Sequence, residues 1–278
     1  MVDNSEVKKV ERVAHVELSD FEREAYREEI KESLDKRKRR ISIKRENLVY
    51  LSDGISYQLR LYTWLPPLDD DERIGTLCLY ESSLMRAFYH QLAIKPSEPQ
   101  SIKLPDYPEV TWKGEGILKT GFICPSMWLD AYFTSVIVRD KASMDVLANF
   151  SISLMRQSST KAGELSYMLV DVIQSFHNRT SDYPDKLVAA MDAALTTDIG
   201  YDFEEVLVKN LQFQEKYHLR ELGPDRIGIR TFINFPLLGM ACMSYDKGNR
   251  FSVETGWLPP YLVEGRWLGD VKAGKISR

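Results

Sequence analysis

Apolar residues recur along most of this chain at intervals of three, four and seven, a spacing that places them on one face of an α-helix. Prolines, glycines and short acidic runs separate these segments and supply helix starts and stops. The predicted helices cover residues 21–41, 46–64, 125–140, 143–155, 164–178, 184–195 and 236–248, and two more begin at the acidic run 69–72 and at the Asp202–Glu205 pair. We therefore expect a mainly α fold, a single multi-helix domain with a small β excursion.

The first predicted helix carries charges that suit both of its ends. Ser19 and Asp20 can cap it ahead of Phe21, and glutamates crowd its first turns. The basic run 36–40 crowds its last turns, where the helix dipole favours cations. Residues 1–40 hold eleven basic and eleven acidic side chains, so the basic run is explained by a solvated helix end. A patch for an anionic partner is the alternative.

Two other predicted helices have distinctive apolar patterns. Segment 125–140 is apolar almost all round and should lie at the centre of the fold, with Pro125 in its first turn. Segment 164–178 is amphipathic, and we expect its stripe to face the core. That stripe comprises Leu165, Met168, Leu169, Val172 and Phe176.

The segment 95–122 is rich in proline and glycine and breaks the helical pattern. Alternation at 101–104 and at 110–113 predicts a small hairpin within it. This segment is the best candidate for an internal boundary. We expect a flexible N-terminus over residues 1–17 and one helical domain over 18–278, with a possible sub-boundary near 95–122.

The C-terminal region is predicted to be less regular. After a stop at Gly248, residues 250–254 are expected to form a short strand. Trp257 and Trp267 follow in a tail rich in proline and glycine. Both are candidates for the core, and exposure in this tail would make them interface anchors.

Composition narrows the classes of protein that the chain can represent. A net charge of -4 over 278 residues implies no general attraction to nucleic acid. Cys78, Cys124 and Cys242 are far apart and lack the paired spacing of a zinc site, so we expect three buried thiols and no metal. The chain shows no secretory signal and no apolar run long enough for a membrane span, so a cytoplasmic location is expected.

The sequence shows no arranged catalytic set. None of the four histidines (His15, His90, His177 and His218) precedes an aspartate or stands in an H-E-x-x-H motif. His90 and His177 lie near predicted helix ends, where a cation is favoured. A catalytic base at either position is the alternative.

Two short motifs carry weak signals for binding. Gly114-Glu115-Gly116 begins like a dinucleotide loop, but the third glycine is missing. The carboxylates at 69–72 are ordinary capping chemistry ahead of a helix. Alternatively, they form a negative patch for a basic partner, such as the active site of a nuclease toxin.

Two segments of this chain resemble a known family. In the first, Trp128 to Asp140, a Trp-Leu…Ala pattern ends in Arg139 and Asp140. In the second, Leu238 to Leu262, an apolar helix is followed by Asp-Lys-Gly, a short extended segment and Trp-Leu-Pro. Together they resemble the immunity protein 49 family of bacterial polymorphic-toxin systems.

The resemblance implies a mostly α-helical protein that binds and neutralises a toxin encoded beside it. It implies no catalytic residue, no cofactor, no nucleic acid and no membrane, with the cognate protein toxin as partner. The family motifs look structural, so toxin-binding residues and oligomeric state stay unknown. The alternatives are a helical enzyme that reverses a toxin's modification and a helical scaffold or regulatory protein.

Overall fold

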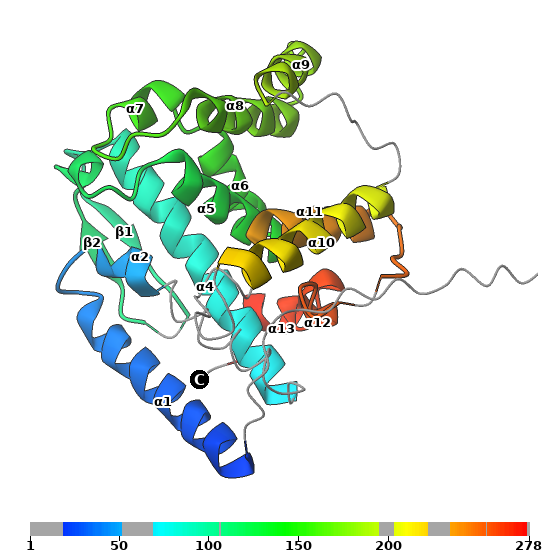
Figure 1. Ribbon diagram of the computed structural model, residues 1–278. Helices are drawn as coiled ribbons and strands as arrows, with labels where there is room; N and C mark the ends of the chain where they lie inside the picture. The colour runs from blue at the N-terminus through cyan, green and yellow to red at the C-terminus, as the bar shows by residue number, and fades with distance from the viewer. Residues whose placement is uncertain are drawn as a thin grey trace, which may run out of the picture.

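The structure, a computed structural model, is mainly α-helical with one small β-hairpin (Figure 1). It describes residues 19–51, 69–105, 107–194, 203–221, 234–253 and 255–276. The expectations for residues 1–17, for the cap at Asp202 and for the helix over 52–64 lie outside these ranges.

Most helices of the described residues lie where the sequence predicts them, and the two short ones nearest the C-terminus were not predicted. They are α1 (Asp20–Arg40), α2 (Asn47–Leu51), α4 (Asp69–Ile94), α5 (Pro125–Ile137), α6 (Lys141–Ala148), α7 (Ile152–Arg156), α8 (Glu164–Asn178), α9 (Tyr183–Ala193), α10 (Phe203–Glu221), α11 (Phe235–Asp246), α12 (Pro260–Val263) and α13 (Leu268–Lys272). A 3₁₀ turn, η1 (Ile117–Lys119), precedes α5. The predicted fold class is confirmed.

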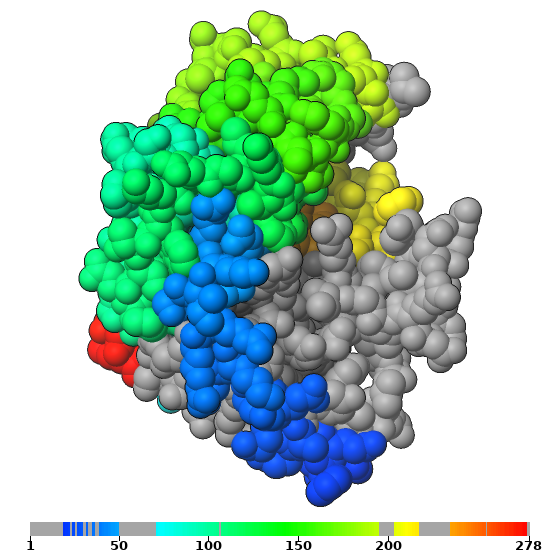
Figure 2. All heavy atoms as spheres, turned by 90° about the vertical axis from the view of Figure 1, so that its left-hand side faces the viewer, coloured from blue at the N-terminus to red at the C-terminus, as the bar shows by residue number. Residues whose placement is uncertain are grey.

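The start of α1 confirms the predicted cap. The backbone N–H of Ser19 donates to the Glu22 carboxylate at 2.8 Å, and the backbone N–H of Glu22 donates to the Ser19 hydroxyl at 3.4 Å. This reciprocal pair satisfies two donors that the first helical turn leaves without a partner. At the other end, Arg39 and Arg40 are exposed, as a solvated helix end requires. Figure 2 shows α1 lying along one face of the molecule.

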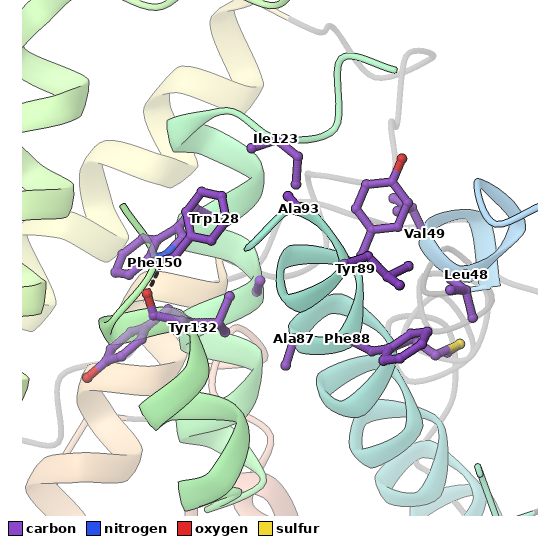
Figure 3. Close-up of a cluster of buried hydrophobic side chains, with 14 of the residues drawn as sticks. Leu48, Val49, Ala87, Phe88, Tyr89, Ala93, Ile123, Trp128, Tyr132 and Phe150 are labelled. Carbon is purple, nitrogen blue, oxygen red and sulfur yellow. Dashed lines mark hydrogen bonds between the residues drawn. The ribbon is translucent and has the colours of Figure 1, made fainter. Parts of the chain in front are cut away.

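Helix α5 lies at the centre of the fold and packs between α4 and α11 (Figure 1). Trp128 and Ala131 on α5 are fully buried, and the Trp128 indole N–H donates to the Leu147 carbonyl at 2.9 Å. Figure 3 shows the cluster that surrounds them, with Tyr89 on α4 and Leu48 on α2 among its members. The almost uniformly apolar surface of α5 is explained by this position between two helices.

A second apolar cluster lies at the other end of α4. It gathers Leu79 of α4 with Leu238 of α11, Leu262 of α12 and the indole of Trp257. Trp257 is only 2 % exposed, so it is a core residue, one of the two roles considered for it, and not an interface anchor. Trp267 is half-buried and donates its indole N–H to the Glu72 carboxylate at 3.0 Å.

The β excursion consists of strands β1 (Gln100–Ile102) and β2 (Val110–Trp112), which pair antiparallel. Ile102 lies opposite Val110 in the register. The hairpin predicted within 95–122 is confirmed. Gly114, just after β2, lies so close to α4 that a Cβ there would come within 1.8 Å of the Leu92 carbonyl oxygen.

Two local predictions are wrong. Residues 143–155 form two helices, α6 and α7, because the chain turns at buried Phe150 and Ser151 caps a new helix by accepting from the Leu154 N–H at 3.3 Å. The described residues of 250–254 form no strand. Their polar groups bond to a helix instead, since the Ser252 backbone N–H donates to the Glu204 carboxylate of α10 at 2.8 Å.

The predicted core face of α8 is correct at buried Val172 and wrong at two other positions. Leu169 and Phe176 are each 42 % exposed, whereas Tyr167, Val170 and Gln174 are buried. Gln174 belongs to the buried face because its amide donates to the Phe150 carbonyl at 2.7 Å and to the Leu147 carbonyl at 3.3 Å. Hydrogen bonds to the ends of α6 therefore decide which face of α8 turns inward, and the apolar stripe lies partly against α9 and partly in solvent.

Candidate functional site

Arg139 and Asp140 follow the end of the central helix α5, and Arg139 connects this end to α11 and α12. Arg139 adopts a left-handed backbone conformation (φ 50°), which directs its side chain toward α11 and α12. The guanidinium binds the Asp246 carboxylate through two N–H donors, at 2.8 and 2.9 Å, and donates to the carbonyls of Leu262 and Val263 at 2.8 and 2.7 Å. Such a bidentate pair is both strong and directional.

Asp140 is bonded inside the fold and does not pair with Arg139. It is 7 % exposed and caps α6, where the Ser143 backbone N–H donates to it at 3.3 Å. The hydroxyls of Ser83 and Ser143 donate to its second oxygen at 3.0 and 2.5 Å. Both residues of the pair therefore position helices, as the structural interpretation of the motif requires.

Beside Arg139, three helices contribute side chains to a hydrogen-bonded chain that is buried at Tyr132 and half-buried at His177 and Asp145. The Tyr132 hydroxyl of α5 lies 3.0 Å from His177 Nδ1 of α8, and His177 Nε2 lies 2.8 Å from Asp145 Oδ1 of α6. Burial, together with the nearby Asp145 charge, raises the pKa of Tyr132 to about 12. The phenol therefore keeps its proton at neutral pH and is available as a donor to His177 Nδ1.

This arrangement gives both ring nitrogens of His177 a hydrogen-bond partner. A general base needs a nitrogen free to accept a proton from a substrate, and a nucleophile needs a lowered pKa. Both ring nitrogens of His177 already have partners within the fold, and burial raises the pKa of Tyr132, so this arrangement meets neither requirement. The chain of bonds instead connects α5, α6 and α8 at a fixed distance.

A cleft of about 1240 Å³ opens directly over these residues. Its lining comes from the end of α5, the start of α6, the turn between α8 and α9, and the end of α11. The polar residues at its rim include Lys141, Asp145, Arg179, Asp246 and Lys247. This cleft brings more polar groups together than the hollow beside His90 or the one beside Gln100, and we take it as the candidate site.

His90 does not lie in this cleft. His90 is 2 % exposed, stacks edge-on against Phe150 and bonds through Nδ1 to the Arg86 carbonyl at 2.8 Å. Burial lowers the pKa of His90 to about 4, so the prediction of a helix-end cation is wrong there. His15 and the side chain of His218 lie outside the described residues.

The remaining sequence signals have structural explanations where the structure describes them. Gly114 and Gly116 open a three-residue 3₁₀ turn and no long helix, so they do not form a dinucleotide loop. Asp71 pairs with Arg27 at 3.0 Å, and buried Glu72 accepts from Trp267, which favours the structural interpretation of the acidic run. Cys78, Cys124 and Cys242 are free and buried, as predicted.

Searches of the described part of the chain for two further kinds of site give negative results. No group of three or more histidine, cysteine or acidic side chains is placed to hold a metal ion within those ranges. None of the helices described here is both long and apolar enough to cross a membrane.

The fold and the cleft define a mainly α-helical protein whose charged side chains mostly join its own helices. Comparison with known proteins gives a family for one part of it: residues 108–201 match the model of the family described as immunity protein 49. This segment contains the first resembling motif and every residue lining the cleft except Met243, Asp246 and Lys247. No curated protein and no solved structure matches the chain.

The match confirms the family resemblance over this segment, and the motif at 238–262 lies outside it. Sequence reasoning selected His177 and the Arg139–Asp140 pair but missed Tyr132, Asp145 and the cationic rim. The partners of His177 are 45 and 32 residues away in the chain, so no local spacing could have connected them.

Proposed function

We propose that this chain is an immunity protein that neutralises a cognate bacterial protein toxin by stoichiometric binding. The family match over residues 108–201 carries the proposal, because the matched segment builds the candidate cleft. The bonding of His177 and Tyr132 within the fold supports inhibition by binding over inhibition by chemistry. The protein would act in the cytoplasm, without cofactor and without nucleic acid.

A direct test is co-expression with the protein encoded by the neighbouring gene. We expect the neighbour alone to stop growth, and co-expression to restore growth and yield a complex of fixed stoichiometry. A harmless neighbour, or one that does not co-purify with this chain, would reject the proposal and favour a scaffold or regulatory role.

An enzyme that reverses the toxin's effect is the second candidate, because a histidine and a carboxylate meet in the cleft. A His177→Gln variant separates the two functions. Under the binding proposal, any loss of growth rescue by this variant tracks its loss of complex formation. If rescue is lost while the complex persists at the same affinity, reversal by chemistry replaces the proposal.

A further inference from the structure

The rim of the cleft carries positive charge that the fold does not neutralise. Lys141 is the first residue of α6, Arg179 follows the end of α8, and Lys247 follows the end of α11. Within the described ranges none of these three side chains forms an ion pair, although the whole chain has a net charge of -4. The helix dipole favours Arg179 and Lys247 at the C-termini of α8 and α11, but not Lys141 at the N-terminus of α6.

The carboxylates at the same cleft are already engaged. Asp145 accepts from His177, and Asp246 holds the Arg139 guanidinium at both oxygens. Both carboxylates are about half exposed and offset part of the positive charge. Arg139, Lys141, Arg179 and Lys247 outnumber them, so the lining of the cleft keeps a net positive charge. The three cations remain available from different sides of one opening, and such a distribution raises the local concentration of negative groups.

An apolar ridge continues from the cleft along the outer side of α8. We call it the α8 ridge and define it by Leu165, Leu169 and Phe176, whose spacing of four and seven puts them in one line. Leu169 and Phe176 are each 42 % exposed, and Phe176 is also a lining residue of the cleft. The positive rim and the apolar ridge therefore meet at Phe176.

From these features we infer that the cleft and the α8 ridge are the docking surface for an acidic polypeptide segment of the partner protein. Carboxylates of the segment contact Lys141, Arg179 and Lys247, and its apolar side chains cover Phe176 and Leu169. A cleft of about 1240 Å³ exceeds the roughly 300–1,000 Å³ of small-molecule sites. A small anion would also leave the ridge uncovered, whereas a polypeptide covers both. The identity of the partner as the toxin rests on the proposed function.

The test uses the full-length protein, a fluorescent peptide of ten glutamates flanked by two leucines, and the cognate toxin. The rim variant is Lys141→Glu, Arg179→Glu and Lys247→Glu combined, with the corresponding triple alanine variant beside it. The charge-matched control combines Lys44→Glu, Lys113→Glu and Lys119→Glu, three exposed lysines that do not line the cleft.

Affinity for the peptide is expected to fall at least about tenfold in both rim variants and less than about twofold in the control. Affinity of the wild type should also fall with added salt, since exposed charges are screened within about 8 Å at physiological ionic strength. Equal losses in the rim and control variants would overturn the inference. Displacement of the peptide by inorganic phosphate at a lower concentration than by unlabelled peptide would make this a small-anion site instead.

The toxin measurement separates this inference from the proposed function. The toxin is expected to bind the wild type and the control, and to bind the rim variants at least about tenfold more weakly. This result would support both the docking surface and the immunity function. Equal toxin binding by the rim variants would reject this docking surface and leave the immunity function intact. If the toxin does not bind even the wild type, the immunity function fails, and the peptide titration alone decides whether the cleft accepts acidic segments.

The α8 ridge has its own matched pair of variants. Leu169→Ser combined with Phe176→Ser should weaken toxin binding at least about fivefold, because interface energy concentrates in apolar anchors. Ile43→Ser, which changes a side chain 65 % exposed and remote from the cleft, should leave binding unchanged. Circular dichroism verifies folding of each variant. Unchanged binding by the folded ridge variant would exclude the α8 ridge from the interface.

Discussion

Single charged residues in this protein connect separate elements, and the contribution of each to stability is measurable by substitution. Arg139 reaches two elements through a bidentate pair with Asp246 and two carbonyl bonds. It also stands in a left-handed conformation that only glycine adopts freely. A substitution of Arg139 therefore changes the stability of the protein in two separate ways. It removes the bonds of the side chain, and it alters the strain of the left-handed backbone.

Two substitutions of Arg139, by alanine and by glycine, should separate the contributions of the side chain and of the backbone to stability. We expect Arg139→Ala to lower the free energy of unfolding by about 2 to 4 kcal/mol, because charged hydrogen bonds are lost and a carboxylate and two carbonyls lose their donor. Arg139→Gly should be about 1 kcal/mol less damaging than alanine, since it relieves the left-handed backbone. Urea unfolding followed by circular dichroism measures both. A glycine variant less stable than the alanine variant would contradict this account.

The burial of His90 should make the stability of the protein depend on pH. Its pKa is lowered to about 4 in the folded state by burial, against an ordinary value of 6.5 in the unfolded chain. Between these values the unfolded state binds the extra proton, so stability is full above pH 6.5 and is lost as the pH falls toward 4. The loss attributable to this residue from pH 7 to pH 5 is on the order of 2 kcal/mol.

The measurement compares wild type with His90→Phe in urea titrations at pH 7 and pH 5. The variant loses the bond to the Arg86 carbonyl and is less stable at pH 7. Between pH 7 and pH 5 the free energy of unfolding should fall less in the variant than in the wild type. The difference should be about 2 kcal/mol. Equal losses in the two proteins would show that His90 does not titrate in this range.

At the scale of helices, α5 and α11 approach so closely at Gly239 that no room is left for a side chain there. A Cβ on Gly239 of α11 would lie 2.6 Å from the ring of Phe133 on α5. Gly239→Ala should therefore destabilise the protein by about 1 to 3 kcal/mol through overpacking. The matched control is Gly269→Ala in α13, where nothing lies within 4 Å of the added atom, and the change should be neutral or slightly stabilising. Thermal unfolding of both variants tests this, and similar melting temperatures would refute it.

Helix boundaries were predictable from the sequence because caps and prolines act locally. Ser19, Pro125 and the segment 164–178 begin or delimit helices where predicted. The orientation of a helix depends on partners distant in the chain. On α8, the bonds of Gln174 to carbonyls around α6 outweigh the apolar stripe, and no pattern within 164–178 contains that information.

The candidate site was predictable only in part, for the same physical reason. Trp128 and the Arg139–Asp140 pair were found because they lie in one continuous segment of the chain that carries a family pattern. The cationic rim was not found, since Lys141, Arg179 and Lys247 are ordinary exposed residues in sequence. Only packing of α8 and α11 around α5 brings them to one opening.

At the scale of the whole molecule, the segment that carries the family match depends on elements outside it. Helix α5 packs between α4 and α11, which begin and end outside residues 108–201. The two apolar clusters both include residues of α4 and of α5, so these helices join the halves of the core. Removing the flanking chain would expose most of the apolar surface of α5 to water.

We therefore expect the isolated segment 108–201 not to fold cooperatively. Its α5 and α8 would keep some helical circular dichroism, but Trp128 would lose its packing against α4, and the near-ultraviolet signal would be flat. The full-length chain, measured in the same buffer, should show a cooperative urea transition. A sigmoidal transition of the fragment with a native-like tryptophan signal would show that the matched segment is a domain in its own right. In that case the cleft residues on α11 would belong to a separate unit, and the docking surface would be built between two domains.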